Sequence, residues 1–267
     1  MTAELRQLVE DTIARGVGAR VFPLRWQGQR VWVKQAVPNK VKGWHRLQRL
    51  IATLTGLPML RPTVSPGGAA GLQSEGRVLR GLALAGVPVP DVVLQTDVWL
   101  VIGDNGAILQ NVIEDAVRDG DEALVTGMIE RAALALAGLH ARAAAHGAPL
   151  LRNITLRDAG DIGFIDFEED PNARMPLPDA QARDVLLFLF SIQRGFKRRA
   201  DLVRAGWQAY LTAAGRDAPQ LRPIGKVVQF LGPVYWLLRP FRRWLGTDAL
   251  NGMLAYRILH HGIRRQS

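Results

Sequence analysis

The chain has 267 residues, 48% of them hydrophobic and 22% charged, so it can form one large domain or two lobes around a cleft. It contains no cysteine, which excludes disulfides, thiolate metal sites and a cysteine nucleophile. The net charge of +10 favours anionic partners, such as nucleotides, nucleic acid, acidic lipid headgroups or phosphorylated sugars, without choosing among them.

The sequence carries no signal for export or membrane insertion. Met1–Glu10 is polar and lacks the apolar centre of a signal peptide, and no apolar run approaches the length of a membrane span. We therefore expect a cytoplasmic protein, either free or peripheral at the inner face of the membrane. Zinc-ligand spacings and nucleic-acid-binding motifs are missing, so only charge favours nucleic acid, and we do not expect that partner.

The first 106 residues are predicted to be rich in β-strands. Periodicity and turn residues predict helices over Thr2–Ala14 and Ser74–Ala85, and strands over Val21–Trp26, Arg30–Gln35, Val92–Gln95 and Val98–Ile102. Gln27-Gly28-Gln29 is predicted to be the turn of a hairpin between the first two strands. Because side chains alternate along a strand, Lys34 is expected on the same face as Trp32 and opposite Val33.

Two basic stretches leave two interpretations open. Lys40–Leu60 predicts an amphipathic basic helix, which either docks with a solvated face or contacts an anionic lipid or substrate. The tail, Ile224–Ile263, interleaves aromatic residues with arginines. That pattern suits a membrane interface or an anionic groove, and it equally suits a final pair of helices packed on the rest of the chain.

The chain after residue 106 is predicted to be helical. Helices are expected over Asp121–Ala145, Asp179–Gln193 and Phe196–Gly215. Gly103–Gly106, which includes Asp104, breaks the strand pattern and is the predicted hinge between a β-rich region, 1–106, and a helical region, 107–267. The predicted fold class is α+β.

One stretch, His146–Asp170, is the starting point for predicting a functional site. Its short strands, Ile154–Leu156 and Ile162–Ile165, predict a hairpin that places Asn153 before one strand and Asp166 after the other. Two oxygen-bearing side chains at one mouth of this hairpin, its open end, suit Mg²⁺. This ion takes one or two protein oxygens and leaves its other positions to water and phosphate. Spacing alone supports equally well a plain capping role for both residues.

The same stretch resembles the catalytic loop and metal-binding segment of protein-kinase-like phosphotransferases, which read H-G-D-x-x-x-x-N and then D-F-G or D-F-E. This chain has His146-Gly147, then Asn153, then Asp166-Phe167-Glu168. It is most similar to the bacterial lipopolysaccharide-kinase-like branch, the Kdo/heptose kinases and related proteins. It departs at one position, because Ala148, followed by Pro149, stands where the family has its catalytic Asp.

The resemblance implies a bilobal protein-kinase-like fold, with a small β-rich N-lobe, a larger helical C-lobe, and ATP with Mg²⁺ as the ligands. Lys34, in Val31-Trp32-Val33-Lys34, matches the lysine that binds phosphates, and Glu75 matches the helical Glu that holds it. Asp104 lies in the hinge, whose backbone binds adenine in the family. Asn153 and Asp166 are the expected Mg²⁺ ligands, with Lys34 and Asp166 the expected catalytic residues.

Simpler interpretations of single residues stay open. Lys34 alone suits a solvated lysine on an edge strand, and Glu75 alone suits an acidic residue in the first turn of a helix. The resemblance further implies that Asp184 hydrogen-bonds to the catalytic-loop backbone and that His146 packs as scaffolding. A Gly-rich phosphate loop is not found, since Gly16-Val17-Gly18 does not match G-x-G-x-x-G.

The expected function is an ATP-dependent phosphotransferase that acts on a hydroxyl of a sugar, lipid or cell-envelope acceptor. Ala148 supports an alternative, a pseudokinase that binds nucleotide as a scaffold without transferring phosphate. A membrane-surface or nucleic-acid adaptor is a third alternative, but it has no need for both Asn153 and Asp166. Glu168 and Asp170 are weak candidates for a replacement base.

Overall fold

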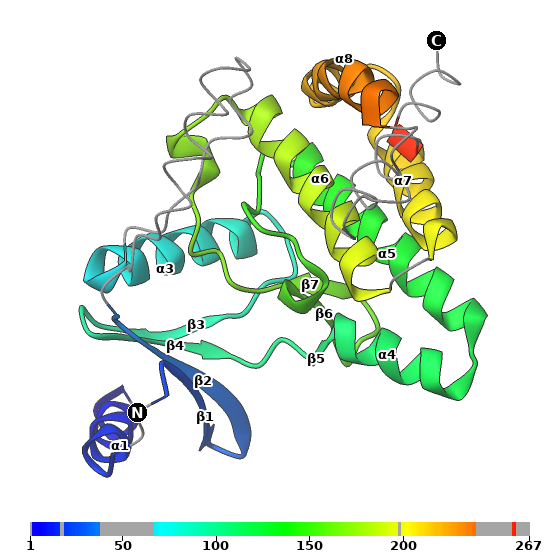
Figure 1. Ribbon diagram of the computed structural model, residues 1–267. Helices are drawn as coiled ribbons and strands as arrows, with labels where there is room; N and C mark the ends of the chain where they lie inside the picture. The colour runs from blue at the N-terminus through cyan, green and yellow to red at the C-terminus, as the bar shows by residue number, and fades with distance from the viewer. Residues whose placement is uncertain (1, 17–18, 38–66, 197–198, 239–257, 260–267) are drawn as a thin grey trace.

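The computed structural model describes residues 2–16, 19–37, 67–196, 199–238 and 258–259, and these form an α+β protein with two small antiparallel sheets (Figure 1). Its elements in chain order are α1 Thr2–Ala14, β1 Val21–Trp26, β2 Gln29–Gln35, α3 Gly68–Leu84, β3 Val92–Gln95, β4 Trp99–Gly103, β5 Ala107–Ile108, α4 Leu109–Asp119, α5 Glu122–Ala141, η2 Leu151–Asn153, β6 Ile154–Leu156, β7 Ile162–Phe164, η3 Pro171–Ala173, α6 Leu177–Gly195, α7 Ala200–Ala214 and α8 Leu221–Leu238. The larger sheet with α1 and α3 lies on one side of the molecule and α4 to α8 lie on the other, which is compatible with a bilobal fold. The predicted helix Lys40–Leu60 and most of the tail after Leu238 lie outside the described residues.

The four-stranded sheet has the strand order β1-β2-β4-β3, and all its neighbouring strands are antiparallel. Gln27 and Gly28 close the predicted hairpin between β1 and β2 with φ of 49° and 78°, the backbone that a tight two-residue turn needs. One face of the sheet packs on α1 in a buried cluster of Leu5, Val9, Phe22, Val31, Val33, Trp99 and Val101. The opposite face carries Lys34 and points to the main core, so the predicted facing of Lys34 is confirmed.

Helix α3 begins earlier than predicted. Its N-cap is Gly67, which makes no side-chain capping bond, and Ser74, the predicted first residue, lies inside the helix, so the predicted start was wrong. Ala69 and Ala70 favour helix but Gly68 and Gly71 do not, and the early part of α3 is supported by the packing of buried residues such as Leu72. Glu75 therefore lies in the interior of α3 and not in its first turn, which removes the helix-dipole explanation for its presence.

The segment predicted to be a hinge, Gly103–Gly106, connects the two sheets and is anchored on the smaller one. Asn105 is buried and its amide donates to the Thr155 hydroxyl at 3.0 Å and to the Phe164 carbonyl at 3.4 Å. Gly106 has a φ of 93°, and a Cβ there would lie 2.2 Å from the Leu156 carbonyl oxygen. The close approach of this segment to the β6–β7 hairpin fixes the hairpin relative to the larger sheet.

Helix α4 was not predicted. It buries Leu109, Ile113 and Ala116, which follow helical spacing, and it ends at Gly120 in the left-handed conformation. It has no side-chain N-cap, and it directly follows the two-residue strand β5, so the usual signal of a helix start is missing. The pattern from Leu109 to Gly120 was the signal that could have revealed it.

The remaining helices match the predictions with shifted ends. Asp121, predicted as the first residue of α5, is its N-cap and accepts from the Leu124 amide at 2.9 Å. That helix ends at Ala141 and not at Ala145, since Ala143 adopts a φ of 54°. Helix α6 starts at Leu177, two residues before the prediction, because proline is well accommodated in a first helical turn.

Helix α5 is long and apolar enough to cross a membrane by length and composition alone, contrary to the expectation that no segment would be. Its packing is that of a core helix. It buries one side against neighbouring elements, with Val125, Ile129, Ala132 and Leu136 fully inaccessible. It lies among α4, α6 and α7 in the helical half of the molecule (Figure 1).

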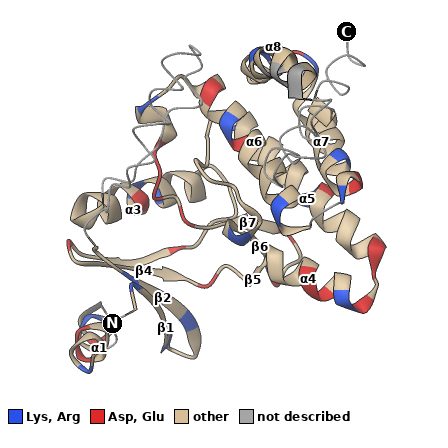
Figure 2. Cartoon of the chain, in the orientation of Figure 1, with Lys and Arg blue, Asp and Glu red and all other residues tan. Residues whose placement is uncertain are grey.

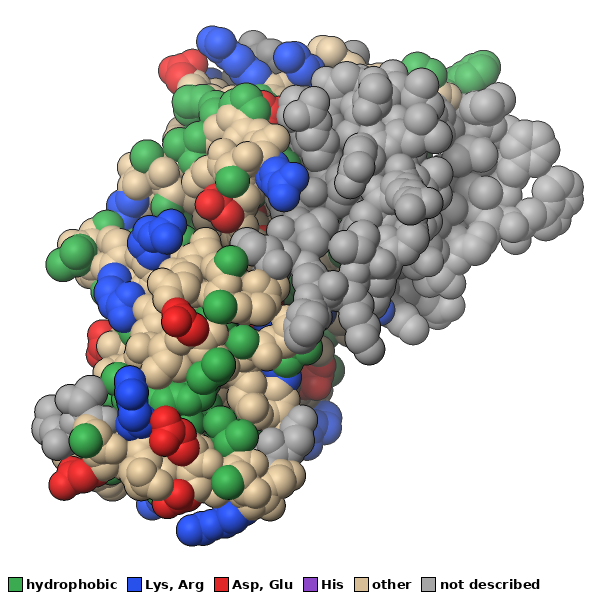
Figure 3. All heavy atoms as spheres, turned by 90° about the vertical axis from the view of Figure 1, so that its left-hand side faces the viewer, with side chains coloured by type: hydrophobic (Ala, Val, Ile, Leu, Met, Phe, Trp, Pro, Cys, Tyr) green, Lys and Arg blue, Asp and Glu red, His purple; other side chains and the backbone are tan. Residues whose placement is uncertain are grey.

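The basic character of the chain comes from residues outside the described ranges. Those ranges exclude 13 of the 34 Lys and Arg residues but only 1 of the 24 Asp and Glu residues, so the described residues carry a net charge of −2. Figure 2 shows acidic and basic residues interspersed along the described elements, and on the face drawn in Figure 3 charged side chains of both signs lie among each other.

Replacing Gly106 tests the anchoring of the connecting segment. We expect Gly106→Ala to lower the free energy of unfolding by clearly more than Gly120→Ala, measured by urea denaturation. Both glycines have positive φ, which costs alanine about 1–2 kcal/mol, but an added Cβ meets nothing within 4 Å at Gly120 and clashes with backbone at Gly106. Equal losses in the two variants would contradict the close contact with the hairpin.

Candidate functional site

The site is centred on Lys34, near the end of β2. Its ammonium Nζ donates to Glu75 Oε1 at 2.6 Å and to Asp166 Oδ1 at 2.9 Å, and it lies 3.5 Å from Glu168 Oε1. The predicted ion pair between Lys34 and Glu75 is therefore present. It joins the larger sheet to α3, and Asp166 joins both to the segment after β7.

The burial of Lys34 removes the simpler interpretation of this lysine. Lys34 is 6% exposed, and β2 lies between β1 and β4, so the residue is not a solvated lysine on an edge strand. An isolated charge at such a position would be strongly unfavourable, because burial deprives it of water. The three carboxylates around Lys34 compensate for that loss.

The neighbouring charges set the protonation of the cluster. Burial works against the ammonium of Lys34, but Glu75, Asp166 and Glu168 raise its pKa well above the usual value. Burial raises the pKa of Glu75, against the opposing effect of Lys34. Burial also works against the ionised form of Asp166, yet Lys34 outweighs it and lowers the pKa of that carboxyl. The Lys34–Asp166 contact is thus a charged pair at neutral pH.

Arg20, just before β1, is a member of the cluster that the sequence did not indicate. Its guanidinium hydrogen-bonds to the same oxygen, Oε1, of Glu168 that faces Lys34. With all groups ionised, Glu75, Asp166 and Glu168 carry three negative charges against the two positive charges of Lys34 and Arg20. The cluster therefore has a net charge of −1, and a further cation would be favourable there.

Asp166 presents its carboxylate in an unusual backbone conformation. Its φ is 69°, in the left-handed region that few residues other than glycine adopt. Strained residues of this kind cluster at functional sites, where surrounding contacts hold them in place. The side chain of Asp166 is 43% exposed, so it remains accessible to a ligand while Lys34 holds one of its oxygens.

Asn153 lies at the start of the same hairpin. The Asn153 carbonyl accepts from the amide of Ile165 at 2.9 Å, so the residue pairs directly with the neighbour of Asp166. Its side-chain Nδ2 donates to the Ala148 carbonyl at 3.0 Å, which fixes the orientation of the amide. The predicted placement of Asn153 and Asp166 at one mouth of the hairpin is thus confirmed.

The donor atoms at this mouth fit Mg²⁺. One carboxylate and one amide oxygen are the hard oxygen ligands that Mg²⁺ prefers, and it commonly binds one or two of them and keeps several waters. Among the described residues there is no group of three or more His, Cys, Asp or Glu side chains able to hold a metal. Asn153 and Asp166 would supply two protein oxygens, which leaves the other positions of Mg²⁺ to water and phosphate.

A second buried carboxylate holds the loop before Asn153. Asp184 in α6 is fully buried and accepts from the backbone amides of His146 at 2.6 Å and Gly147 at 2.8 Å. The bonds that the resemblance implied for Asp184 are present. Its Oδ2 also lies 3.3 Å from His140, whose other ring nitrogen contacts the Tyr210 hydroxyl at 2.7 Å. The loop is thereby tied to α5, α6 and α7.

His146 acts as scaffolding in the structure. Its ring stacks on Phe167 with centroids 4.3 Å apart and meets Phe164 edge-on at 5.7 Å. It is fully buried, and burial lowers its pKa below the usual value, so the ring is neutral at physiological pH. This packing places Phe167, and with it Asp166, against the loop.

The acidic residues after Asp166 have separate partners. Glu168 contacts Lys34 and Arg20, whereas Glu169 lies 3.3 Å from Arg183. Asp170 caps η3 by accepting from the amide of residue 173 at 3.2 Å. Of the two weak candidates for a base, Glu168 lies in the cluster and Asp170 is engaged in a structural cap.

Asp104 lies near the cluster without joining it. Its carboxylate accepts from the Trp32 indole at 2.8 Å, and its backbone amide donates to the Arg30 carbonyl at 3.2 Å. Trp32 shares a face of β2 with Lys34, so Asp104 borders the same side of the sheet. The sequence indicated only the sheet face on which Trp32 lies. In the structure, its partly buried indole forms part of the surface next to Lys34.

Comparisons with known proteins add little about activity. No protein-family model matches the chain. A protein of Haemophilus influenzae, described only as uncharacterized, is 26% identical to it over 249 residues, which are 93% of each chain. The similarity is therefore not confined to the site, and it brings no activity to this chain.

Removing the ammonium of Lys34 should expose the cost of burying Glu75. We expect Lys34→Met to lower the free energy of unfolding by about 3–5 kcal/mol at neutral pH, because it leaves a buried carboxylate without a cation. The pKa of Glu75 in the folded state then rises further above its unfolded value, so the folded state holds a proton that the unfolded state releases. Stability should therefore fall as the pH increases from about 5 to about 8.

The double variant Lys34→Met/Glu75→Gln is the control. It removes the buried carboxyl as well, so it should recover stability at neutral pH and lose the added pH dependence. Urea denaturation of both variants at the two pH values measures the effect. The same pH dependence in both would show that Glu75 is not the group that takes up the proton.

Proposed function

We propose that this chain has a protein-kinase-like fold and is an ATP-dependent phosphotransferase that acts on a hydroxyl of a sugar, lipid or cell-envelope acceptor. The observation that supports the proposal best is the buried Lys34–Glu75 pair in contact with Asp166 at the mouth of a hairpin that begins at Asn153. Phosphoryl transfer depends mostly on positioning and charge neutralisation, and these residues supply both.

Each residue has a role that its surroundings suit. Lys34 is fixed by Glu75 and can neutralise the α- and β-phosphates of ATP. Asn153 and Asp166 would hold Mg²⁺, which supplies positive charge to the phosphates when it is bound. Asp104 and its neighbouring backbone border the sheet face next to Lys34, where the base of the nucleotide would lie.

Arg20 offers a second cation in place of the missing Gly-rich loop. Arg20 and Lys34 both contact one oxygen of Glu168, an arrangement in which a carboxylate oxygen lies between two cations. A phosphate oxygen has the same charge and accepts the same hydrogen bonds. Displacement of Glu168 by phosphate would leave both cations paired, so Arg20 can cover the phosphates as the absent loop does in the family.

A nucleotide-binding scaffold without transfer activity is the second candidate, and Ala148 favours it. Ala148 carries no ionisable group, His146 is buried and neutral, and Asp170 caps a turn. Of the two candidates for a replacement base, Glu168 is the one near Asp166, and its Oε1 is engaged by Arg20 and Lys34. Any transfer in the wild-type protein would therefore be slow.

We also propose that the protein is cytoplasmic and that it attaches reversibly to anionic membranes. The basic stretch Lys40–Leu60 lies outside the described residues, and so does most of the aromatic and basic tail. In the described part of the tail, Phe230 and Trp236 on α8 are exposed. An adaptor that uses no nucleotide is not favoured, since it gives no role to the cluster around Lys34.

Nucleotide binding is expected to depend on Asp166. We predict that calorimetry detects Mg²⁺-dependent ATP binding by the wild-type protein and that Asp166→Ala abolishes it, because the variant lacks the one carboxylate at the proposed metal position. Asp158→Ala, in the exposed turn of the same hairpin, should bind as the wild type does. A folded Asp166→Ala protein with unchanged binding would remove the metal assignment.

The substitution Ala148→Asp separates the two candidate functions. General-base catalysis contributes typically about 10²–10⁴-fold, so a weakened kinase should turn over ATP slowly and gain activity when the carboxylate is restored. A scaffold should remain at background turnover while it still binds ATP. Rapid ATP turnover by the wild type would contradict the expectation that a base is missing.

A further inference from the structure

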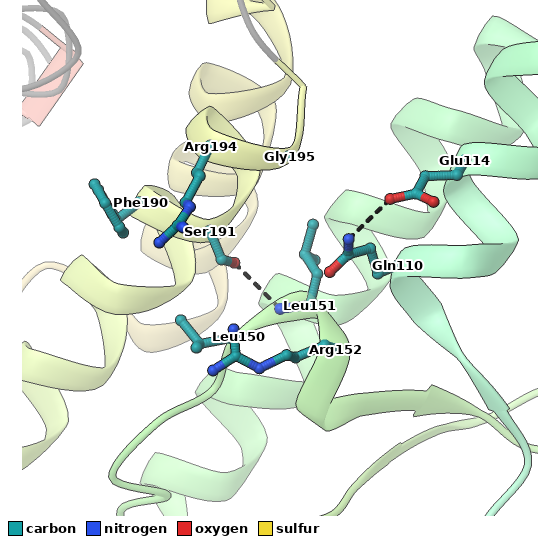
Figure 4. A pocket seen from close by; sticks show the side chains of 9 residues that line it. All are labelled: Gln110, Glu114, Leu150, Leu151, Arg152, Phe190, Ser191, Arg194 and Gly195. Carbon is teal, nitrogen blue, oxygen red and sulfur yellow. Dashed lines mark hydrogen bonds between the residues drawn. The ribbon is translucent and has the colours of Figure 1, made fainter. Parts of the chain in front are cut away.

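A cavity lies directly behind the loop that carries Asn153. Its volume is about 350 Å³, within the range of small-molecule sites, and it opens between α4, η2 and the C-terminal end of α6 (Figure 4). The residues that line it are Gln110, Glu114, Leu150, Leu151, Arg152, Phe190, Ser191, Arg194 and Gly195. None of them belongs to the cluster around Lys34, so the cavity is separate from that cluster.

Two arginines give the cavity its charge. Arg152 in η2 and Arg194 in α6 reach toward it from different elements, and both are exposed (Figure 4). Neither guanidinium has an ion-pair partner within the described ranges, unlike Arg183 and Arg199, which both pair with carboxylates. The carboxylate in the wall, Glu114, accepts from Gln110 at 2.8 Å. The wall thus carries two positive charges against one negative charge.

The remaining polar group of the wall is already engaged. Ser191 Oγ accepts from the Leu151 amide at 3.2 Å and donates to the Phe188 carbonyl at 2.7 Å, which clamps η2 onto α6. The two guanidinium groups are therefore the strong donors left for a ligand. Guanidinium binds phosphate and carboxylate with paired hydrogen bonds, which makes an anionic group the natural occupant.

The position of Arg152 links this cavity to the site around Lys34. Arg152 immediately precedes Asn153 in η2, so their Cα atoms are about 3.8 Å apart. Arg152 is exposed whereas Asn153 is buried and tied to Ala148, so the two side chains leave the same turn in different directions. A small molecule held by Arg152 would therefore lie beside the turn that positions Asn153.

We propose that this cavity binds a phosphate or carboxylate group carried by the phosphoryl acceptor, and that Arg152 and Arg194 thereby select an anionic acceptor. The proposal rests on the proposed function for the identity of the ligand as acceptor. Leu150 and the half-exposed Phe190 provide an apolar wall for the carbon skeleton next to the anionic group. An acceptor fixed in this way would lose much of its freedom before the reaction, which is how positioning accelerates transfer.

The test measures binding of small anions without nucleotide, by ligand-observed NMR. The probes are glucose 6-phosphate and glucuronate, with glucose as the neutral control and vesicles of anionic phospholipid to distinguish a lipid headgroup from a free anionic sugar. We expect the anionic probes to bind and glucose not to bind. Arg152→Ala/Arg194→Ala should weaken binding about tenfold or more, whereas Arg152→Lys/Arg194→Lys, which keeps the charge but loses the paired hydrogen bonds, should weaken it less.

Arg77→Ala, at an exposed arginine on α3, is the matched control and should bind the probes as the wild type does. Unchanged binding by the double alanine variant, or equal binding of glucose, would overturn the proposal. Calorimetry of the double alanine variant with ATP and Mg²⁺ separates the two proposals. Normal nucleotide binding together with lost probe binding supports both, whereas probe binding without any nucleotide binding by the wild type would leave an anion site and remove its role in phosphoryl transfer.

Discussion

The charge of Lys34 is the constraint on which the arrangement of the site depends. An ammonium that is 6% exposed has lost almost all of its hydration, so the fold must supply negative charge around it. The carboxylates come from two distant places in the chain, Glu75 in α3 and Asp166 after β7, which are 41 and 132 residues away. Satisfying one buried charge therefore brings the larger sheet, α3 and the hairpin together.

Asp184 performs the same task in the helical half of the molecule. Its buried carboxyl group accepts from the backbone amides of His146 and Gly147, so it fixes the loop through the backbone and not through side chains. The stack of His146 on Phe167 then connects that loop to Asp166. The buried Lys34 and the buried Asp184, each with partners on other elements, thus hold Asp166 and the loop before Asn153 from two sides. In the proposed function, a ligand would still have to displace Glu168 from Arg20 and Lys34.

The sequence predicted the features that depend on local chemistry. The β6–β7 hairpin, the turn at Gly28 and the facing of Lys34 follow from alternation and turn residues over a few positions. The start of α3 was placed too late because a Gly-rich approach looks like a loop, and α4 was missed for lack of a cap. The contacts of Lys34 could be anticipated only through the resemblance, because pairing across 132 residues leaves no periodic signal.

Two features had no signal in the sequence, namely the position of Arg20 and the cavity. Each depends on elements that lie far apart in the chain. Arg20 carries no motif, and only the fold brings it to Glu168 across 148 residues. The cavity behind the loop has α4 as one wall, so it could not be anticipated once that helix was missed. Arg152 and Arg194 are 42 positions apart in the chain, and they line one cavity where Ser191 joins η2 to α6.

If the proposed function is right, Ala148 in place of the Asp of the kinase-like proteins that the chain resembles acts on chemistry and not on architecture. The Ala148 carbonyl accepts from Asn153 at 3.0 Å, and its amide donates to the His146 ring at 3.3 Å, so this position supports the loop through its backbone. Any residue with an ordinary backbone could make these bonds. The hydrogen bonds that hold Asn153 near Ala148 therefore do not depend on the side chain at position 148. In the proposed function, that side chain would matter only as a proton acceptor. The shape of the loop therefore does not distinguish a slow kinase from a nucleotide-binding scaffold. The two would differ in whether some group accepts the proton of the acceptor hydroxyl.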